Sequence, residues 1–591
     1  MPVSIDRRGW LLVSWLLTAL PLAALEPPGQ ADAEVAGQVQ PLLAKWDRPD
    51  NPGCTVAVVR RGEIVYSRGF GSANLESQSP NSPQTVFETA SFSKTLTCAC
   101  VALLLDEGRL SPEDELRTFV PEMHAFDPPI RIQDLVRCRS GIWDQVSVPI
   151  LIGWENAPQQ TPHKAADFLS LLAGQRTLPF RPGTEFRYSS GDYFLLATIV
   201  QRITGKTLAA FGRERIFEPL GMTRTFVDED PTRIIPQRAV GHWKPEPGAW
   251  RLWRPTANWH GGGGVCTCVE DLCRWDREFS ERRLPRGKHL DELLSEGTLL
   301  GNRYVLDLDA YRKETDAEAR RESPPGQYRG LARHQFTGGA WGFTTAMSRF
   351  PEQQLTVICL SNSDEIAAWT INRQIADVLL AGQLAPVSLA RPASELPAVD
   401  LEPALLRDIA GDYRLRGTGT LWKIAVAGGA VSLTDQRQTT CKLRPIGPDR
   451  LDPEGPQFYA TTQFMFTRPA PDKPPAFISR WDEPDQRGQL HFDRVELVQP
   501  TPADLAAYAG EYVSNELAAT YRFEVREGAL WLRVNSRRWE PLSPTVRDEF
   551  IPEVRAPTEG RVFRFVRNDR DEVTGLTADY YRVSGVRFQK R

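Results

Sequence analysis

The sequence predicts an α+β domain followed by two small antiparallel β-barrels, and three observations support this prediction. Residues 52–71 are predicted to form two strands joined by a turn at Gly62, and a long apolar stretch at residues 95–105 then predicts a buried helix. A second apolar segment at residues 355–362 predicts a late sheet strand. A weak repeat of alternating segments fills the C-terminal third. The chain has 591 residues, so two to four domains are expected.

The N-terminus predicts an export signal. Arg7 and Arg8 precede an apolar stretch at residues 10–25, which is typical of a secretory signal peptide, and residues 1–33 are therefore assigned to signal and leader. The stretch is short for a membrane span, although a retained N-terminal anchor is the alternative. No other stretch is expected to span a bilayer. The predicted location is the periplasm or the exterior.

Composition limits the partners that can be expected. The net charge of −4 and the pI near 6.1 provide no electrostatic case for nucleic-acid binding. The nine cysteines are odd in number and lie mostly among apolar or small residues, so they do not predict a disulfide framework. No metal-ligand spacing is convincing, and no metal site is predicted. The sequence leaves the oligomeric state open.

Residues 91–94, Ser-Phe-Ser-Lys, are the strongest chemical signal. Residues three apart share a helix face, so Ser91 is expected to open the buried helix with Lys94 stacked against it. Serine is a weak nucleophile until a neighbouring base activates it, and a lysine at this spacing can provide that base. On the motif alone, an N-capping serine beside a solvent-facing lysine is the more common explanation.

Further segments in a fixed order favour the catalytic interpretation. They are residues 85–91, 186–196, 261–272 and 336–343. Together with the Ser-x-x-Lys motif, they resemble the serine β-lactamase and penicillin-binding-protein superfamily, in its class C-like branch of esterases, D-aminopeptidases and D,D-peptidases. The resemblance covers roughly residues 40–385. It implies a catalytic domain at 34–385, with an antiparallel sheet flanked by helices and a helical subdomain.

The resemblance also implies roles for individual residues. Ser91 attacks an ester or amide carbonyl, while Lys94 and Tyr188 move the protons. The backbone N–H groups of Ser91 and Gly339 form the oxyanion hole. The implied substrate contacts are Ser190, Phe336, Thr337 and Gly338. No cofactor is implied, and the expected partner is a small-molecule or peptide substrate.

Two departures from the family pattern bear on substrate choice. Ser190 stands where asparagine is usual, and Phe336 stands where lysine or histidine is usual. Phenylalanine offers no positive charge to a substrate carboxylate. The chain is therefore expected to be a serine hydrolase that forms an acyl-enzyme on a short ester, a D-aminoacyl amide or a small peptide, rather than an efficient β-lactamase. The alternative is a non-catalytic ligand- or penicillin-binding protein that retains the fold.

The C-terminal third is organised differently. Residues 386–403 are proline-rich and predict a linker. Two copies of Ala-Gly-acid-Tyr, ending at Tyr413 and Tyr512, each precede short alternating segments. They predict two barrels, at 404–500 and 501–591, which resemble the lipocalin-like barrels of some hydrolases in this superfamily. Each barrel is expected to have its own core and a structural or ligand-binding role without catalytic residues.

Overall fold

The structure is a computed structural model. It describes residues 30–154, 164–230, 232–246, 249–253, 260–296, 299, 326–340, 342–386, 396–401, 403–416, 420–435, 440–454, 462–467, 475–483, 486–553, 560–580 and 582–591. The predicted signal peptide lies outside this part of the chain. Among the described helices, none combines the length and the apolar character that a bilayer crossing requires.

A five-stranded antiparallel sheet forms the centre of the N-terminal domain, in the order β12-β13-β14-β1-β2. Its strands are β1 (Cys54–Arg60), β2 (Glu63–Phe70), β12 (His334–Ala340), β13 (Phe343–Phe350) and β14 (Leu355–Ser361). The predicted hairpin and the predicted late strand are confirmed. They are neighbours, since Val58 of β1 pairs with Val357 of β14. The sheet therefore joins strands from the two ends of the domain's sequence.

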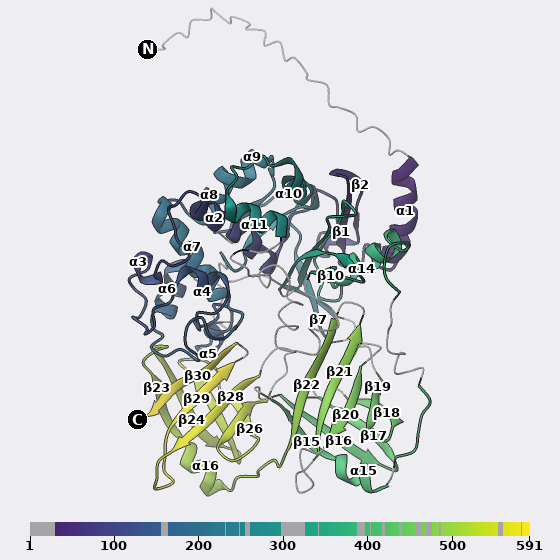
Figure 1. Ribbon diagram of the computed structural model, residues 1–591. Helices are drawn as coiled ribbons and strands as arrows, with labels where there is room; N and C mark the ends of the chain where they lie inside the picture. The colour runs from purple at the N-terminus through teal and green to yellow at the C-terminus, as the bar shows by residue number, and fades with distance from the viewer. Residues whose placement is uncertain are drawn as a thin grey trace, which may run out of the picture.

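Helices cover both faces of this sheet. The N-terminal helix α1 (Gln30–Leu43) and α14 (Ala368–Leu379) pack together, with α1 against β2 and α14 against β13 and β14. Helix α10 (Val269–Glu281) packs against β1 and β14. Figure 1 shows α1 and α14 at one side of the domain and the helical part, with α2 and α7, at the other. The arrangement confirms the predicted α+β class.

Helix α2 (Ser93–Asp106) is the central helix of the helical part. Every residue from Ser93 to Leu105 is buried, which matches the nearly continuous apolar sequence. It packs against α7 (Ser190–Thr204), α8 (Leu208–Gly212) and α11 (Lys288–Glu296). Further helices in the described part of the domain are α3 (Leu116–Phe119), α4 (Ile132–Val136), α5 (Val148–Leu151), α6 (Ala165–Ala173) and α9 (Glu218–Leu220), with a short π-helix at Arg213–Phe217.

Short strands complete the N-terminal domain. They are β3 (Ser72–Asn74), β4 (Ser79–Pro80), β5 (Phe87–Glu88), β6 (Phe226–Val227), β7 (Gly241–Glu246), β8 (Ala249–Trp253), β9 (Val265–Thr267), β10 (Gln327–Tyr328) and β11 (Leu331–Ala332). Of these, β5, β9 and β6 form one small sheet, and β5 leads directly into the segment that contains Ser91.

Two closed eight-stranded barrels follow, as predicted. Barrel 1 consists of β15 (Gly411–Leu415), β16 (Leu421–Ala427), β17 (Ala430–Thr434), β18 (Thr440–Gly447), β19 (Arg450–Glu454), β20 (Gln463–Thr467), β21 (Ala476–Glu483) and β22 (Gln486–Val495). Barrel 2 consists of β23 (Gly510–Ser514), β24 (Ala519–Arg526), β25 (Ala529–Val534), β26 (Glu540–Pro544), β27 (Glu549–Pro552), β28 (Arg561–Arg567), β29 (Val573–Tyr580) and β30 (Val583–Lys590).

The repeated tyrosine has the same structural role in both barrels. A short helix, α15 (Pro403–Ile409) or α16 (Pro502–Tyr508), precedes the first strand of each barrel. The Tyr413 hydroxyl donates to the carbonyl of Ile409 at 2.8 Å, and the Tyr512 hydroxyl donates to the carbonyl of Tyr508 at 2.9 Å. Each bond links the strand to the helix before it, which explains why the repeat marks the start of each barrel.

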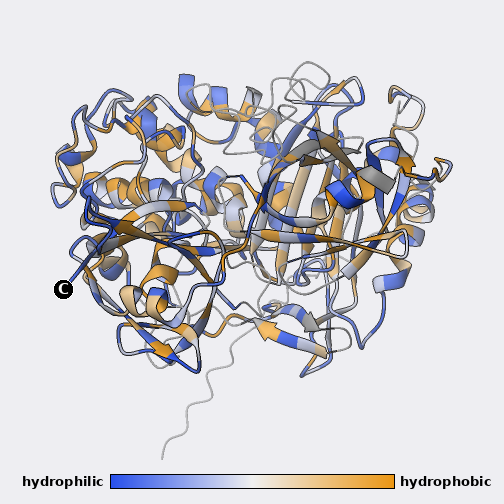
Figure 2. Ribbon diagram, turned by 90° about the horizontal axis from the view of Figure 1, so that it is seen from below, coloured by the Kyte–Doolittle hydropathy of each residue, from blue (hydrophilic) through white to orange (hydrophobic). Residues whose placement is uncertain are grey.

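The two barrels differ in how their cores relate to the rest of the molecule. Barrel 1 has a separate core of stacked aromatic rings, in which Phe477 and Phe492 lie 4.4 Å apart at 9°. The core of barrel 2 is continuous with that of the helical part. The expectation that each barrel has its own core is therefore wrong for barrel 2. Figure 1 shows barrel 2 directly beneath α5, which packs against β29. Figure 2, seen from below, shows apolar stretches in orange alternating with hydrophilic stretches in blue along the ribbons.

Candidate active site

Ser91 lies in a tight turn just before α2. The turn, Ala90–Phe92, is a short 3-10 helix, so α2 begins two residues later than the predicted helix. Ala90 has φ = 49°, a left-handed conformation that costs a non-glycine residue about 1 kcal/mol or more. Strand β9 holds the turn in place, because the Thr89 hydroxyl donates to the Val265 carbonyl at 2.9 Å. The turn places the Ser91 side chain at the start of the helix.

Lys94 points back toward Ser91 from the first turn of α2 and is only 1% exposed. Its Nζ lies 3.5 Å from the Ser91 Oγ, 3.2 Å from the Ser190 Oγ and 2.7 Å from the Gly262 carbonyl oxygen. These three acceptors match the three donors of an ammonium group. The solvent-facing alternative for Lys94 is therefore wrong.

Tyr188 completes the cluster from a third segment. Its hydroxyl donates to the Ser91 Oγ at 2.8 Å, and the Lys94 Nζ lies 4.7 Å from the centre of its ring. Tyr188 lies two residues before α7, whose N-cap is Ser189. The structure thus brings Ser91, Lys94 and Tyr188 together, as the sequence predicts.

Ser190, the first residue of α7, faces the same cluster. Besides accepting from Lys94, it donates its backbone N–H to the Asp144 Oδ2 at 2.7 Å. The hydroxyl that replaces the family's asparagine therefore contacts the lysine directly. Ser190 is almost completely buried.

Strand β12 passes directly beside the nucleophile turn. A Cβ on Gly338 would lie 2.0 Å from the Thr89 carbonyl oxygen and 3.0 Å from the Ser91 nitrogen, so only glycine permits this approach. Gly339 follows on the same strand, and a Cβ there would meet nothing within 4 Å. Because Gly338 lies against the Ser91 nitrogen, the backbone of the next residue, Gly339, is also near Ser91. Its role in an oxyanion hole, together with the Ser91 N–H, stays a prediction.

The predicted substrate contact of Phe336 is wrong in this structure. Its side chain is 1% exposed, and its ring packs edge-on against Phe92 and Phe279 at 6.3 and 6.0 Å. Successive residues of a strand point to opposite faces, so Phe336 and Gly338, which are two apart, share the face that is turned to the helical core. Thr337 points to the other face and is nearly buried. The apolar residue at this position therefore belongs to the core.

Three residues near the cluster were missed by sequence reasoning. The Gly262 carbonyl accepts from Lys94, and a Cβ on Gly262 would lie 2.8 Å from the Ser190 Cβ. The glycine-rich run at 261–264 was noticed, but its contact with the lysine was not. Asp144 accepts the Ser190 N–H, and the guanidinium carbon of Arg582 lies 4.4 Å from the ring centre of Tyr188. Neither residue had a local signal, because each is an isolated charged residue whose importance depends on partners distant in sequence.

Burial changes the protonation of several groups near the site. It raises the pKa of Glu88 to about 7, with the Arg238 charge opposing the shift. Burial also raises the pKa of Asp192 well above its usual range, although the Ser140 hydroxyl bonds to its carboxyl group. It lowers the pKa of His260 to about 4. The surroundings of the cluster therefore disfavour isolated charge.

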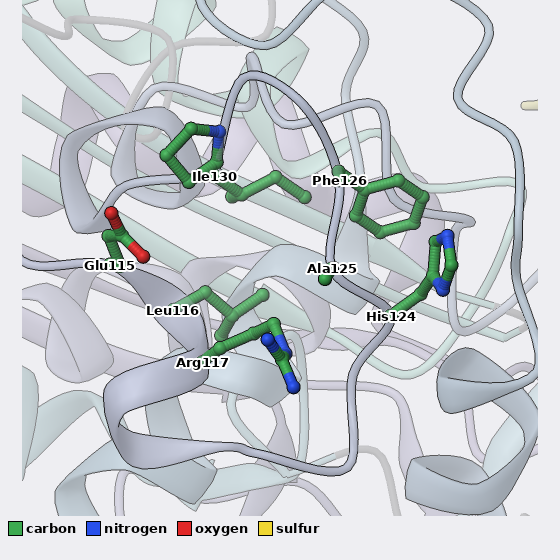
Figure 3. Close-up of a pocket in the computed structure, with 8 residues that line it drawn as sticks. Glu115, Leu116, Arg117, His124, Ala125, Phe126 and Ile130 are labelled. Carbon is green, nitrogen blue, oxygen red and sulfur yellow. The ribbon is translucent and has the colours of Figure 1, made fainter.

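A separate small pocket lies elsewhere on the helical part. It is lined by Glu115, Leu116, Arg117, His124, Ala125, Phe126, Pro129 and Ile130. Figure 3 shows these side chains around α3 and the loop that follows it. None of the residues in the Ser91 cluster lines this pocket, and it has no nucleophile beside a base. The Ser91 cluster is the candidate active site.

Comparison with known families agrees with this geometry. A family model described as beta-lactamase matches residues 37–379, which is more than half of the chain. The chain therefore belongs to the beta-lactamase family. The match includes the Ser91 turn, Tyr188 and strand β12, and it ends before the two barrels.

Curated relatives include D-aminopeptidases. The one from Gluconobacter oxydans is 31% identical over 255 residues, which is 42% of this chain and 46% of the relative. The one from Brucella anthropi is 31% identical over 235 residues, or 39% and 43% of the two chains. The matches thus span less than half the length of these relatives.

Solved structures with a similar fold are more distant. An octameric penicillin-binding protein homologue from Pyrococcus abyssi is 19% identical, covers 86% of this chain and 99% of its own, and has a TM-score of 0.46. A D-amino acid amidase from Ochrobactrum anthropi SV3 is 17% identical, with 60% and 99% coverage and a TM-score of 0.43.

Proposed function

We propose that this protein is a serine hydrolase that works through an acyl-enzyme. The observation that supports the proposal best is the contact of the Ser91 Oγ with both the Tyr188 hydroxyl and the Lys94 ammonium. In the first step one group of the Tyr188–Lys94 pair, in its deprotonated form, takes the Ser91 proton while the Oγ bonds to the substrate carbonyl carbon. The pair then gives that proton to the departing alcohol or amine as its bond to the carbonyl carbon breaks. In the second step water attacks the acyl carbon, the bond between this carbon and the Ser91 Oγ breaks to release the acid, and a proton from the water returns to the Oγ through the same pair.

The proposed substrates are short esters, D-aminoacyl amides and small peptide derivatives. The D-aminopeptidase relatives support the amide class. The third motif has no cation, since Phe336 is part of the core, so a substrate carboxylate finds no partner at this position. Penicillins carry such a carboxylate. We therefore expect better turnover of neutral esters and amides than of β-lactams.

A covalent probe tests the nucleophile. A fluorophosphonate should label the wild-type protein rapidly and the Ser91→Ala variant not at all, because only an activated serine reacts with this probe. Ser77→Ala, which changes an exposed serine, is the matched control and should label like the wild type. Equal labelling of wild type and Ser91→Ala, or no labelling of the folded wild type, would contradict the proposal. The second result would favour the non-catalytic binding protein.

A substrate panel then separates the classes. Purified protein is assayed on a short aryl ester, on D- and L-alanine anilides and on a chromogenic cephalosporin. The proposal expects turnover of the ester or of the D-anilide, with the cephalosporin slowest. Efficient β-lactam hydrolysis by the wild type would overturn the substrate assignment while leaving Ser91 as the nucleophile.

A further inference from the structure

The hairpin of β29 and β30 in barrel 2 reaches the candidate active site. Arg582 lies at its turn, and its guanidinium carbon is 4.4 Å from the ring centre of Tyr188. A planar guanidinium packs well on an aromatic face, and the contact is attractive because the ring face is electron-rich. The same tyrosine donates to the Ser91 Oγ. A residue from the last strands of the chain thus contacts the side chain that touches the nucleophile.

Arg582 has a second contact on the catalytic domain. Its Nη1 lies 3.6 Å from the Oδ2 of Asp144, a carboxylate that is fully buried, whereas the arginine side chain is 24% exposed. The same Oδ2 accepts the Ser190 backbone N–H. A buried carboxylate needs compensating charge and hydrogen bonds. Arg582 therefore lies between the ring of Tyr188 and the carboxylate that holds the first residue of α7.

Other contacts hold the hairpin against the catalytic domain. The Arg187 Nη1 donates to the Ser584 Oγ at 2.8 Å, one residue away from Tyr188. Farther from the site, the Tyr521 hydroxyl of barrel 2 donates to the carbonyl of Leu151 at 2.6 Å, next to the shared core. The position of Arg582 is thus supported by packing that extends well beyond its own two contacts.

We propose that Arg582 is a positioning residue of the active site, holding Tyr188 through its ring and the start of α7 through Asp144. Barrel 2 then takes part in catalysis, contrary to the expectation that neither barrel contributes to the chemistry. The inference rests on the proposed hydrolase function. Without Arg582 the Tyr188 phenol is less well aligned with Ser91, and a misalignment of about 1 Å can cost roughly 100-fold in rate.

The test uses the full-length chain with Arg582→Ala and Arg582→Lys. Steady-state kinetics on a short aryl ester give kcat and KM, with kcat expressed per site that fluorophosphonate labels at completion. Arg582→Ala should lower kcat roughly 10- to 100-fold and change KM less than about threefold. Arg582→Lys keeps the charge without the planar group, so its kcat should lie between those of the wild type and Arg582→Ala. Arg587→Ala, an exposed arginine on the same hairpin, should behave like the wild type.

Chemical rescue separates positioning from folding. Added guanidinium at low millimolar concentration should restore part of the kcat of Arg582→Ala, while urea at the same concentration should not. A loss of labelled sites with unchanged kcat per site, or a loss of kcat without rescue by either lysine or guanidinium, would overturn the inference. Wild-type values of kcat and KM in Arg582→Ala would also overturn the inference. If the wild type itself neither labels nor turns over, the proposed function fails instead.

Discussion

At the scale of single residues, the Ser91 oxygen is a point where three segments meet. The nucleophile turn carries this oxygen, and the first turn of α2 and the segment before α7 each contribute one polar atom within 3.5 Å of it. The Lys94 Nζ is also held by a carbonyl and a second hydroxyl, so its position does not depend on Ser91 alone. The tyrosine hydroxyl is the shortest contact of the serine.

Tyr188→Phe removes that hydroxyl and leaves the ring in place. We expect the rate of fluorophosphonate labelling and the kcat on an aryl ester to fall about 100- to 10,000-fold, because proton transfer by a positioned group contributes on this order. The melting temperature should change little, since the ring keeps its contacts. Tyr66→Phe, on β2 away from the cluster, is the control. Near-normal labelling of Tyr188→Phe would exclude the tyrosine from the proton transfer.

Glu88 introduces a pH dependence of stability next to the nucleophile turn. Its folded pKa of about 7 lies above its ordinary value of 4.5. Between these pH values the folded state keeps a proton that the unfolded state has lost, so stability present at pH 4.5 is lost as the pH rises through 7. The loss is on the order of 3 kcal/mol.

The matched variants are Glu88→Gln and Glu63→Gln, the second at an exposed position. Thermal melts from pH 5 to pH 8 should show a fall in the wild type and in Glu63→Gln, and a flatter profile in Glu88→Gln. Parallel profiles for all three proteins would mean that Glu88 titrates in its ordinary range.

At the scale of elements, close backbone approach determines where strand β12 lies. Gly338 allows the strand to pass the nucleophile turn, and Gly262 allows its loop to reach the start of α7. Both approaches place a backbone group beside Ser91 or Lys94. The site is therefore built from main-chain contacts as much as from side chains.

Gly338→Ala and Gly339→Ala form a matched pair on one strand. The first places a methyl group 2.0 Å from the Thr89 carbonyl oxygen, and the second meets nothing within 4 Å. Gly338→Ala should lower stability by about 1–3 kcal/mol and slow labelling of Ser91, because the turn must move. Gly339→Ala should preserve both, since alanine keeps the backbone N–H. Chemical denaturation and labelling rates measure the two effects, and equal behaviour of the pair would refute this account.

At the scale of the whole molecule, the two barrels are expected to respond differently to damage. Phe477 lies in the separate aromatic core of barrel 1, whereas Phe588 stacks on Tyr521 at 4.0 Å within the core that barrel 2 shares with the helical part. Replacing a buried phenylalanine by alanine typically costs about 3–5 kcal/mol. This loss of stability is expected to affect the active site only for Phe588→Ala, because the core of barrel 2 is shared with the helical part.

As the temperature rises, Phe588→Ala should therefore lose fluorophosphonate labelling at Ser91 first. At the same temperatures Phe477→Ala should still label fully. Labelling across a temperature series, beside calorimetry of both variants, provides the comparison. If both variants label like the wild type up to the melting of the catalytic domain, barrel 2 is an independent unit, as the sequence predicts.

The sequence by itself determined the features that depend on local pattern. The apolar run after Lys94 predicted α2, the segment at 355–362 predicted β14, and the Ala-Gly-acid-Tyr repeat predicted two barrels. Ser91, Lys94 and Tyr188 were found because their motifs lie in a recognisable order. The helix and strand signals extend over a few residues and follow from chain periodicity, whereas the three site residues follow from the resemblance of their motifs to a known family.

Only the tertiary structure decided what depends on long-range packing. The alternation of a strand shows that Phe336 and Thr337 face opposite sides, but the side that is the core depends on which helix packs there. Arg582 and Asp144 are ordinary charged residues until folding brings Arg582 to the ring of Tyr188 and Asp144 to the start of α7. The fusion of the barrel 2 core with the helical part has the same cause, because hydrophobic burial is non-directional and sequence pattern does not specify its partner.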